Sequence, residues 1–410
     1  MRIYSSPTVL ATALLLASAL PASAQRVAFE RSYTVGATPT LDVSTIRGKI
    51  DVSVGTADRI AVRGTATVRV GLSSPTDAYE LVKRVAANPP IEQEGGTLRL
   101  RPPAAPEEQR AMTVAYAVSV PRGTVVRTNS DSGETTIAGV SGKVSVRTES
   151  ASILVRDLSG DAYVTTQSGS VDADSVGGNL DVTTQSSRVS VRNLGAGLRV
   201  RTQSGAVEGT FRGQGNVDVG TGSSAIDLVG VNGGLTATSN SGRIRVSGLP
   251  TAPWQVTSGS GSFELDFDSN AKLTLDARSG SGSVRVDGSA LQGSTTKGAA
   301  SGTVGGGGPL VKANSRSGSI RVGLRQITRG RALSPPRPWF PVPESAYFAL
   351  CDVSISTIPA LTAGGSFSLS LTDPRLKPSR MVPLTLTRAP LRGTPRLDTT
   401  QSFPLSSSIW

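Results

Sequence analysis

Residues 164–181 read VTTQSGSVDADSVGGNLD, and residues 182–199 repeat the pattern as VTTQSSRVSVRNLGAGLR. In both stretches, apolar and polar residues alternate in short runs, and Gly, Ser and Asn residues separate the runs. Alternation with a period of two is typical of strands that bury one face, and the separating residues are typical of turns. The pattern therefore predicts about two short β-strands in each stretch.

The same unit recurs over residues 132–325, marked by a small pair, often Ser-Gly, before an alternating apolar run. Successive units are 18 to 21 residues long, because the serines of this phrase are Ser132, Ser150, Ser168, Ser186, Ser204, Ser223, Ser241, Ser260 and Ser281. A strand this short cannot bury its apolar side alone, but stacking each coil on the next pairs its backbone and aligns its inward side chains. We therefore predict an all-β fold, a parallel, β-helix-like β-solenoid with coils of about 18 residues.

An in-register stack makes predictions for single residues, because equivalent positions lie about 4.8 Å apart on adjacent coils. One predicted inward column is Ile153, Val171, Val189, Val207, Ile226, Ile244, Phe263 and Val284. The other is Val164, Val182, Val200, Val219, Ala237 and Val256. An outward column is Asp172, Ser190, Glu208, Asp227, Arg245, Glu264 and Arg285, whose later members alternate in charge and should pair at the surface. Gln167, Gln185 and Gln203 also align, and we expect their amides to form a ladder between coils.

Residues 25–131 are predicted to be a less regular, strand-rich N-terminal part of the solenoid. Candidate strands lie at residues 41–54, 60–70, 97–101 and 112–120. A short helix is predicted near residues 75–87, because Ser74 fits an N-cap, Pro75 the first turn and Asp77 an acidic third position. Such a helix can shield the end of the solenoid from edge-to-edge pairing.

Residues 1–24 have the three parts of a secretory signal peptide: Arg2, an apolar run over residues 9–20, and Ala22-Ser23-Ala24. We predict cleavage after Ala24 and export to the periplasm, the cell surface or the medium. The apolar run is shorter than the roughly 20 residues that a membrane-spanning helix needs, so no transmembrane segment is expected after cleavage. Cys351 is the sole cysteine and cannot form a disulfide within the chain.

The composition changes at about residue 326. Residues 326–410 contain 12 of the 25 prolines but only 4 of the 46 glycines, and the Ser-Gly-x-Val phrase ends with Ser317-Gly318-Ser319-Ile320. Two interpretations are open for this segment. It is either a disordered, Pro-rich tail or the product of a shifted reading frame, because the last repeat breaks off without a tapering cap.

The sequence offers few groups for catalysis. It contains no His, which removes the usual near-neutral acid–base group and the commonest metal ligand. Asp172 and Asp174 lie two apart, as do Asp266 and Asp268, so each pair shares a strand face. A polysaccharide lyase or glycosidase uses such acids, but ordinary surface carboxylates have the same spacing.

Other motifs also fall short of a site. Lys143, Lys272 and Lys297 have no Ser-x-x-Lys spacing, and residues 213–218 (GQGNVD) only partly match the calcium phrase Gly-Gly-x-Gly-x-Asp. We therefore predict no catalytic, cofactor-binding or metal-binding residue. Trp254 is the one tryptophan of the repeat region, and it either stacks on a sugar or packs at a turn. Nucleic acid is not an expected partner despite the net charge of +12, because basic residues alternate with acids and aromatic platforms are missing.

A resemblance follows from the order of these motifs. The helix near residues 77–86, the EQEGGTL strand at residues 92–98, the VSVPRGT phrase at residues 118–124 and the Ser-Gly-x-Val coils occur in that order. The region 27–325 thereby resembles the bacterial β-strand-repeat "putative adhesin" family, which is defined by a domain of unknown function. The resemblance implies an exported, surface-associated protein and supplies no catalytic residues.

Three functions are compatible with these observations. The first is a non-enzymatic, adhesin-like envelope or surface scaffold that binds another macromolecule, an envelope protein or a glycan. The second is a solenoid carbohydrate-active enzyme, a polysaccharide lyase or hydrolase. The third is a regulatory or sensor module of envelope stress. Export, repeats and the lack of His favour the first.

Overall fold

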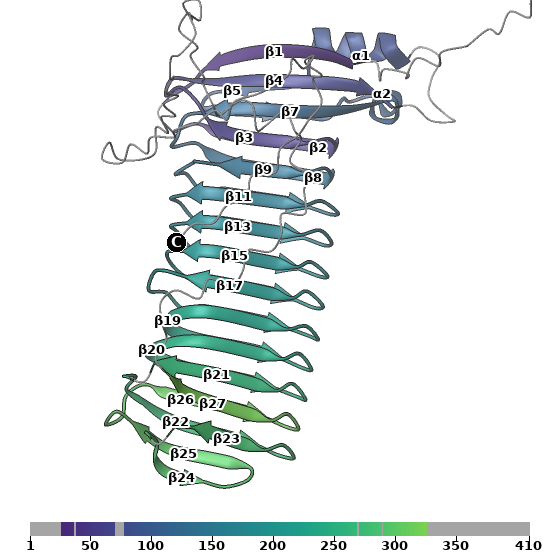
Figure 1. Cartoon of the computed structure of the whole chain (residues 1–410). Coiled ribbons are helices and arrows are strands. Elements are labelled where there is room, and N and C mark those ends of the chain that lie inside the picture. The colour runs from purple at the N-terminus through teal and green to yellow at the C-terminus, as the bar shows by residue number, and fades with distance from the viewer. Residues whose placement is uncertain (1–25, 37, 70–77, 269, 289, 326–410) are drawn as a thin grey trace, which may run out of the picture. The chain divides into compact units, whose positions relative to one another are not determined.

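A computed structural model describes residues 26–36, 38–69, 78–268, 270–288 and 290–325, all within the compact unit Met1–Arg329 (Figure 1). The predictions for residues 1–24, for the N-cap residues 74–77 and for residues 326–410, Cys351 included, lie outside the described residues. The described strands form one large, mixed and mostly parallel sheet that curls back on itself in a solenoid-like stack. In the described ranges no helix is long and apolar enough to cross a membrane.

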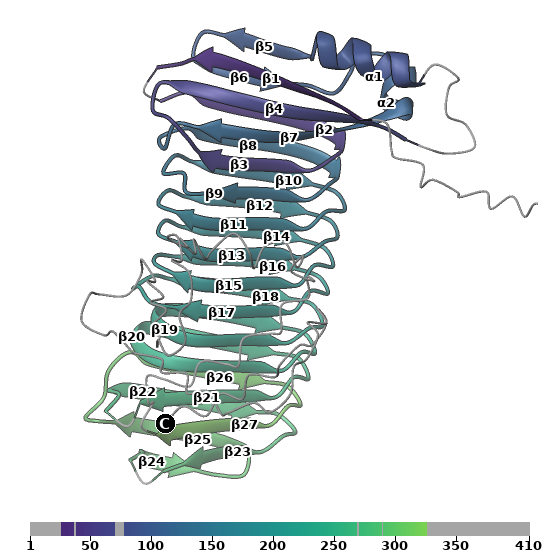
Figure 2. The same cartoon turned by 45° about the horizontal axis from the view of Figure 1, so that its top comes forward.

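The middle of the stack consists of two series of short parallel strands (Figure 2). The even series is β8 (Val125–Ser132), β10 (Val144–Thr148), β12 (Ala162–Thr166), β14 (Leu180–Thr184), β16 (Leu198–Thr202) and β18 (Val217–Thr221). The odd series is β9 (Thr135–Ala138), β11 (Ile153–Leu158), β13 (Val171–Val176), β15 (Val189–Leu194) and β17 (Val207–Phe211). The next two strands, β19 (Ile226–Ser239) and β20 (Ile244–Ser258), are longer: β19 pairs with both β17 and β18, and β20 pairs along β19.

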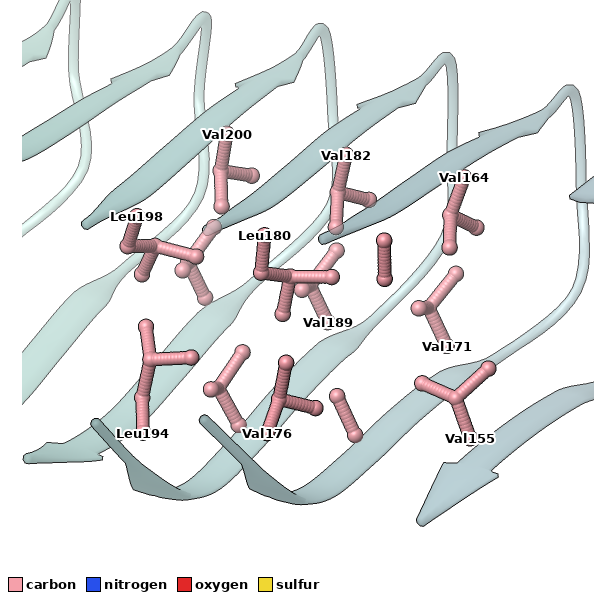
Figure 3. Close-up of a cluster of buried hydrophobic side chains, with 14 of the residues drawn as sticks. Val155, Val164, Val171, Val176, Leu180, Val182, Val189, Leu194, Leu198 and Val200 are labelled. Atoms are coloured by element: carbon pink, nitrogen blue, oxygen red, sulfur yellow. The ribbon is translucent and has the colours of Figure 1, made fainter. Parts of the chain in front are cut away.

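The register agrees with the predicted columns over most of the stack. Val171 is the parallel partner of Val189, and Val189 is the partner of Val207. In the second column, Val164 pairs with Val182 in the same way. The side chains of the two series point toward each other and fill a thin core of small aliphatic residues (Figure 3). Equivalent side chains on neighbouring coils therefore lie one above the other.

The turn after each even strand explains the recurring Ser-Gly phrase. After β14, β16 and β18, a threonine hydroxyl two residues before the serine accepts a hydrogen bond from the backbone amide three positions later, as Thr202 Oγ1 does from Gly205 N at 2.9 Å. Gly205 itself lies against the coil before it, and a Cβ at this position would be 1.8 Å from the carbonyl oxygen of Ser187. The phrase thus combines a hydroxyl that holds the turn with a glycine that lets coils approach.

The C-terminal end differs from the predicted order of coils. Its strands are β21 (Phe263–Asp268), β22 (Leu273–Ser279), β23 (Val284–Asp287), β24 (Gln292–Thr295), β25 (Ala299–Val304), β26 (Leu310–Ser315) and β27 (Ile320–Arg325). The last coil, β26–β27, lies between the β20–β21 coil and the β22–β23 coil. The predicted contact between Phe263 and Val284 is therefore wrong, because Ile320 pairs with both.

The C-terminal end of the stack is capped by a β-hairpin that precedes the last coil in the sequence. β25 runs antiparallel to both β22 and β24, so the β24–β25 hairpin continues the sheet beyond β22. The expectation that the repeats end without a cap is wrong for this reason. The hairpin precedes the last coil in sequence, and the strands that follow it return to the interior of the stack.

The N-terminal end is also closed by antiparallel strands. Its strands are β1 (Arg26–Thr34), β2 (Thr40–Arg47), β3 (Ile50–Val54), β4 (Arg59–Val68), β5 (Ile91–Glu94), β6 (Thr97–Leu100) and β7 (Met112–Val120). β4 runs antiparallel to β1 and β7, whereas β2 and β3 join the stack in parallel. The predicted fully parallel solenoid is thus correct for the middle and wrong at both ends.

Two helices accompany this end, although the sequence predicted one. The expected helix is α1 (Ala78–Ala87), whose residues Val82 and Val85 are buried where it contacts β1 and β4. The second, α2 (Pro106–Ala111), begins with a proline and two acidic residues but buries only Ala111. It was not predicted because it lacks an apolar stripe, which is the signal that identified α1.

Candidate binding groove on the even-strand face

In the first acidic pair noted in the sequence, Asp174 belongs to a network of hydrogen bonds at the surface. Asp174 Oδ1 accepts hydrogen bonds from Ser175 Oγ at 2.9 Å and from Asn193 Nδ2 at 3.0 Å, and Oδ2 lies 3.5 Å from Arg192 Nε. Partial burial raises the pKa of Asp174, but these hydrogen bonds and the charge of Arg192 outweigh it and hold the pKa below its usual value. A carboxyl with a lowered pKa is a poor general acid. Asp172 points outward beside it, with Ser190 as its partner on the next coil.

The second acidic pair noted in the sequence also lies among contacts that stabilise the fold. Asp266 and Asp268 lie on β21, where the side chain of Asp268 accepts a hydrogen bond from the backbone amide of Asn270 at 3.0 Å and so stabilises the following turn. Asp266 is aligned with Ser247 on one neighbouring strand and Gly323 on the other. Among the described residues, no group of three or more acidic or sulfur ligands could hold a metal ion.

Two of the lysines noted in the sequence and the partial calcium phrase contact other parts of the chain. Lys143 Nζ lies 4.2 Å from the centre of the Tyr163 ring, and the backbone carbonyl of Lys297 accepts a hydrogen bond from Val284 N. Asp218, the acid of the calcium phrase, forms an ion pair with Arg201 on the neighbouring coil. The side chains of Lys143 and Asp218 are therefore held by contacts within the chain.

Trp254 belongs to the core. Its side chain is only 1% exposed, its indole Nε1 donates to the carbonyl oxygen of Gly233 at 2.8 Å, and its ring contacts Phe267 at a centroid distance of 5.3 Å. Of the two interpretations offered by the sequence, the structure supports packing, but within strand β20 and not at a turn. The ring cannot stack on a ligand without unfolding this part of the stack.

A groove lies on the face formed by the even strands. Its volume is about 680 Å³, and it extends over β12, β14, β16, β18 and the end of β19. Its outward lining consists of threonine hydroxyls, side-chain amides and arginines: Arg147, Thr165, Gln167, Thr183, Gln185, Arg201, Gln203, Thr238 and Asn240. Gly220 and Gly222 lie where two further side chains would otherwise project into the groove. Two outward columns reach a glycine here, because Gly220 follows Arg201 in the parallel register and Gly222 follows Gln203.

The predicted amide ladder does not form. Gln167, Gln185 and Gln203 are exposed, and within the described ranges no hydrogen bond joins their side-chain amides to each other or to another group. The backbone carbonyls of Gln167 and Gln185 instead accept from the buried threonines Thr184 and Thr202. The amides therefore present free donors and acceptors to the groove, about 4.8 Å apart from coil to coil.

A second hollow of about 250 Å³ continues the groove toward the N-terminal end. The two share Arg147 and Gln167, and the second adds Asn129, Asp131 and Glu149. The charges along the combined groove are balanced, since Arg147 lies among Asp131 and Glu149, and Arg201 pairs with Asp218. An uncharged ligand therefore meets hydrogen-bonding groups without a strong field of either sign.

The odd-strand face is chemically different. Arg245 Nε lies 2.9 Å from Glu264 Oε2, and Arg245 Nη1 lies 3.5 Å from Asp227 Oδ2. Arg188 pairs with Glu208 at 3.1 Å on the same face. This face satisfies much of its polarity internally, whereas the even-strand face leaves its amides and hydroxyls open. The groove is thus the better candidate for recognition.

Sequence reasoning did not identify Tyr163. This residue lies on β12, two positions before Thr165, and its ring is 39% exposed on the same face as the groove. The signal was present, because an aromatic residue occupies an outward position that holds Asp181 and Arg199 on the next two coils. Lys143 Nζ lies over this ring, 4.2 Å from its centre.

One family model agrees with the sequence resemblance. Residues 178–323 match the family model described as Toastrack DUF4097, which confirms the predicted relation to a domain of unknown function. A "putative cell adhesion protein" from Clostridium sporogenes is similar at 12% identity and a TM-score of 0.20, over 73% of this chain and 100% of that chain. A "putative adhesin" from Bacteroides fragilis is similar at 15% identity and a TM-score of 0.24, over 72% of this chain and 96% of that chain. No curated protein matches the chain.

Proposed function

We propose that this protein is a non-enzymatic, exported β-solenoid scaffold, with coils of about 18 residues, that binds an envelope or surface macromolecule in an adhesin-like manner. The observation that carries the proposal is the row of open amides and hydroxyls in the even-strand groove. A scaffold that repeats the same donors and acceptors at each coil fits a ligand that is itself a repeating polymer. Export rests on the signal peptide predicted at residues 1–24.

The groove favours an uncharged glycan over a protein strand. A glycan offers many hydroxyl and acetamido groups, which pair with the free amides of Gln185 and Gln203 and with the hydroxyl of Thr183. The balanced charge gives no preference for an acidic polymer. No exposed sheet edge lies inside the groove to accept an added peptide strand, because each of its strands is paired on both sides.

A glycine substitution tests the groove without removing a polar group. A Cβ at Gly220 would contact the Arg201 side chain at an ordinary 3.4 Å, so Gly220→Ile fits the strand and fills the groove. We expect affinity electrophoresis of the full chain with cellohexaose, chitohexaose and neutral polysaccharides to show binding. Gly220→Ile should weaken that binding at least 10-fold, about the loss expected when two or more hydrogen bonds are blocked.

The matched control is Gly96→Ile, which adds the same side chain in a turn where a Cβ meets nothing within 4 Å. This variant should bind the sugars as the natural protein does. Equal binding by the natural chain and Gly220→Ile would remove the groove from the proposal. Binding of envelope proteins but of none of the sugars would keep the scaffold and exclude the glycan.

The enzyme hypothesis lacks a supporting observation in the structure. Its best pair contains Asp174, whose pKa is lowered rather than raised. It is tested by assaying acidic polysaccharides with the natural chain and with Asp172→Ala and Asp266→Ala. Turnover that these substitutions abolish would replace the scaffold proposal with a catalytic one.

A further inference from the structure

The intercalated last coil creates a charge pattern that the repeat order does not predict. On the odd-strand face, the coils follow each other as β20, β21, β27 and β23. One outward row of this grid is Arg245, Glu264, Arg321 and Arg285. The sign alternation expected between Glu264 and Arg285 is therefore broken, because Arg321 lies between them.

Arg321 and Arg285 are direct partners in the parallel register. Like charges in this position repel each other across about 4.8 Å of backbone spacing. Arg321 is compensated, since its Nε lies 2.6 Å from Asp287 Oδ2. Arg285 is exposed and has no ion pair or side-chain hydrogen bond with any described residue. The charge of Arg285 thus has no counterion within the part of the chain that the structure describes.

The surroundings of Arg285 form a built hollow. Its volume is about 410 Å³, and Arg243, Arg285 and Arg321 all line it. Between the arginines lie serine hydroxyls, among which Ser283 Oγ donates to Ser319 Oγ at 3.4 Å. The one acid of the lining, Glu264, is bound by Arg245 at 2.9 Å. The hollow therefore presents free guanidinium and hydroxyl donors and little free negative charge.

We propose that this hollow binds a phosphate group, held by the guanidinium of Arg285 and assisted by Arg321 and the hydroxyls of Ser283 and Ser319. Guanidinium groups bind phosphate oxygens with paired, charge-assisted hydrogen bonds, and a tetrahedral phosphate has oxygens left for hydroxyl donors. Bound phosphate also supplies the counterion that Arg285 lacks among the described residues. The site is on the other face from the groove and does not depend on the proposed glycan.

Calorimetric titration of the full chain with sodium phosphate tests the site, against sodium chloride of equal ionic strength. We expect saturable heat with phosphate alone. Arg285→Gln should bind at least about 10-fold more weakly, because it removes a hydrogen bond between charged groups. The matched control Arg156→Gln, an exposed arginine on β11 of the same face, should leave phosphate binding unchanged.

Thermal unfolding separates binding from a structural role. Without phosphate, Arg285→Gln should melt at or above the temperature of the natural chain, because it relieves like-charge repulsion. With phosphate, the natural chain and Arg156→Gln should gain melting temperature, and Arg285→Gln should not. Absence of phosphate-specific heat, unchanged affinity in Arg285→Gln, or a lower melting temperature of that variant in phosphate-free buffer would each overturn the site.

Vesicle sedimentation identifies the source of the phosphate. Phosphatidylglycerol vesicles present phosphate diesters at a surface, and phosphatidylcholine vesicles are the neutral control. Retention on the first vesicles only, lost in Arg285→Gln, assigns the site to a surface-bound phosphate. Binding of inorganic phosphate without vesicle retention supports a soluble phosphate ligand. Equal retention on both vesicles, without phosphate heat, contradicts the proposal.

Discussion

In one column of buried threonines, the effect of each hydroxyl on stability depends on whether it has a hydrogen-bond partner. Thr166, Thr184 and Thr202 are successive partners in the parallel register, and all are buried. Thr202 Oγ1 accepts from Gly205 N, whereas Thr166 Oγ1 is buried without a hydrogen-bond partner in the described part of the chain. The same residue type in the same column therefore stabilises one turn and leaves an unsatisfied polar atom in another.

This contrast gives a matched pair of substitutions. Thr202→Val keeps the shape but leaves the amide of Gly205 without its acceptor, so it should lower the free energy of unfolding by about 1–3 kcal/mol. Thr166→Val removes an oxygen that has no partner and should be neutral or stabilising. Urea unfolding followed by circular dichroism measures both. Equal losses for the two variants would contradict the role assigned to the hydroxyl.

Asp174 predicts a pH dependence at one site. Its pKa is held below the unfolded value, so the carboxylate stabilises the folded state above the unfolded pKa, and this contribution is lost as the pH falls through the folded pKa. Asp174→Asn should therefore be less stable than the natural chain at neutral pH, and the difference should shrink below about pH 4. Thermal unfolding between pH 7 and pH 2.5 measures this. A difference that grows with acidity would reverse the assigned sign.

At the scale of elements, the last coil fixes the C-terminal end. Ile320 is 1% exposed and lies between Phe263 and Val284, so Ile320→Ala leaves a cavity between three coils and should cost about 2–5 kcal/mol. Leu310→Ala is the control, because Leu310 on β26 is 45% exposed and should change stability by less than about 0.5 kcal/mol. Hydrogen exchange should report faster opening of β22 and β23 in Ile320→Ala only. Unchanged exchange in both strands would separate them from the last coil.

The sequence could predict the columns but not the order of the final coils. Val171, Val189 and Val207 follow from alternation and a constant spacing, because local periodicity determines which side chains face inward. β21, β23 and β27 each follow a Ser-Gly-Ser phrase, so no local signal distinguishes β27 from β23 as the neighbour of β21. The antiparallel β22–β25 pairing decides that order, and it arises from contacts distant in sequence.

The candidate sites illustrate the same limit. The glutamines of the groove were recognised as a column, but their lack of partners depends on side-chain geometry that spacing does not specify. The arginine hollow could not be predicted, because Arg285 and Arg321 come from coils whose adjacency was not foreseen. Trp254 was ambiguous because a single aromatic residue beside a proline has the same local sequence whether buried or exposed.

At the scale of the described unit, both ends of the stack are closed by antiparallel strands, and α1 covers strands of the N-terminal cap. A solenoid with open ends would offer unpaired strand edges to another copy. Among the described strands, β1 pairs only with β4 and is contacted by α1, so the helix protects this edge. We therefore expect another copy to pair along β1 only when α1 is released.

Val82→Asp tests this protection. Val82 is fully buried on the docked face of α1, and a carboxylate there should release the helix because a buried, unpaired charge is costly. We expect the variant to form dimers or larger species that increase with concentration in size-exclusion chromatography with light scattering. Ala87→Asp places the same group at an exposed position of the helix and should remain monomeric. A monomeric Val82→Asp with α1 released would show that the cap strands alone prevent end-to-end pairing, and the helix would then only cover the core.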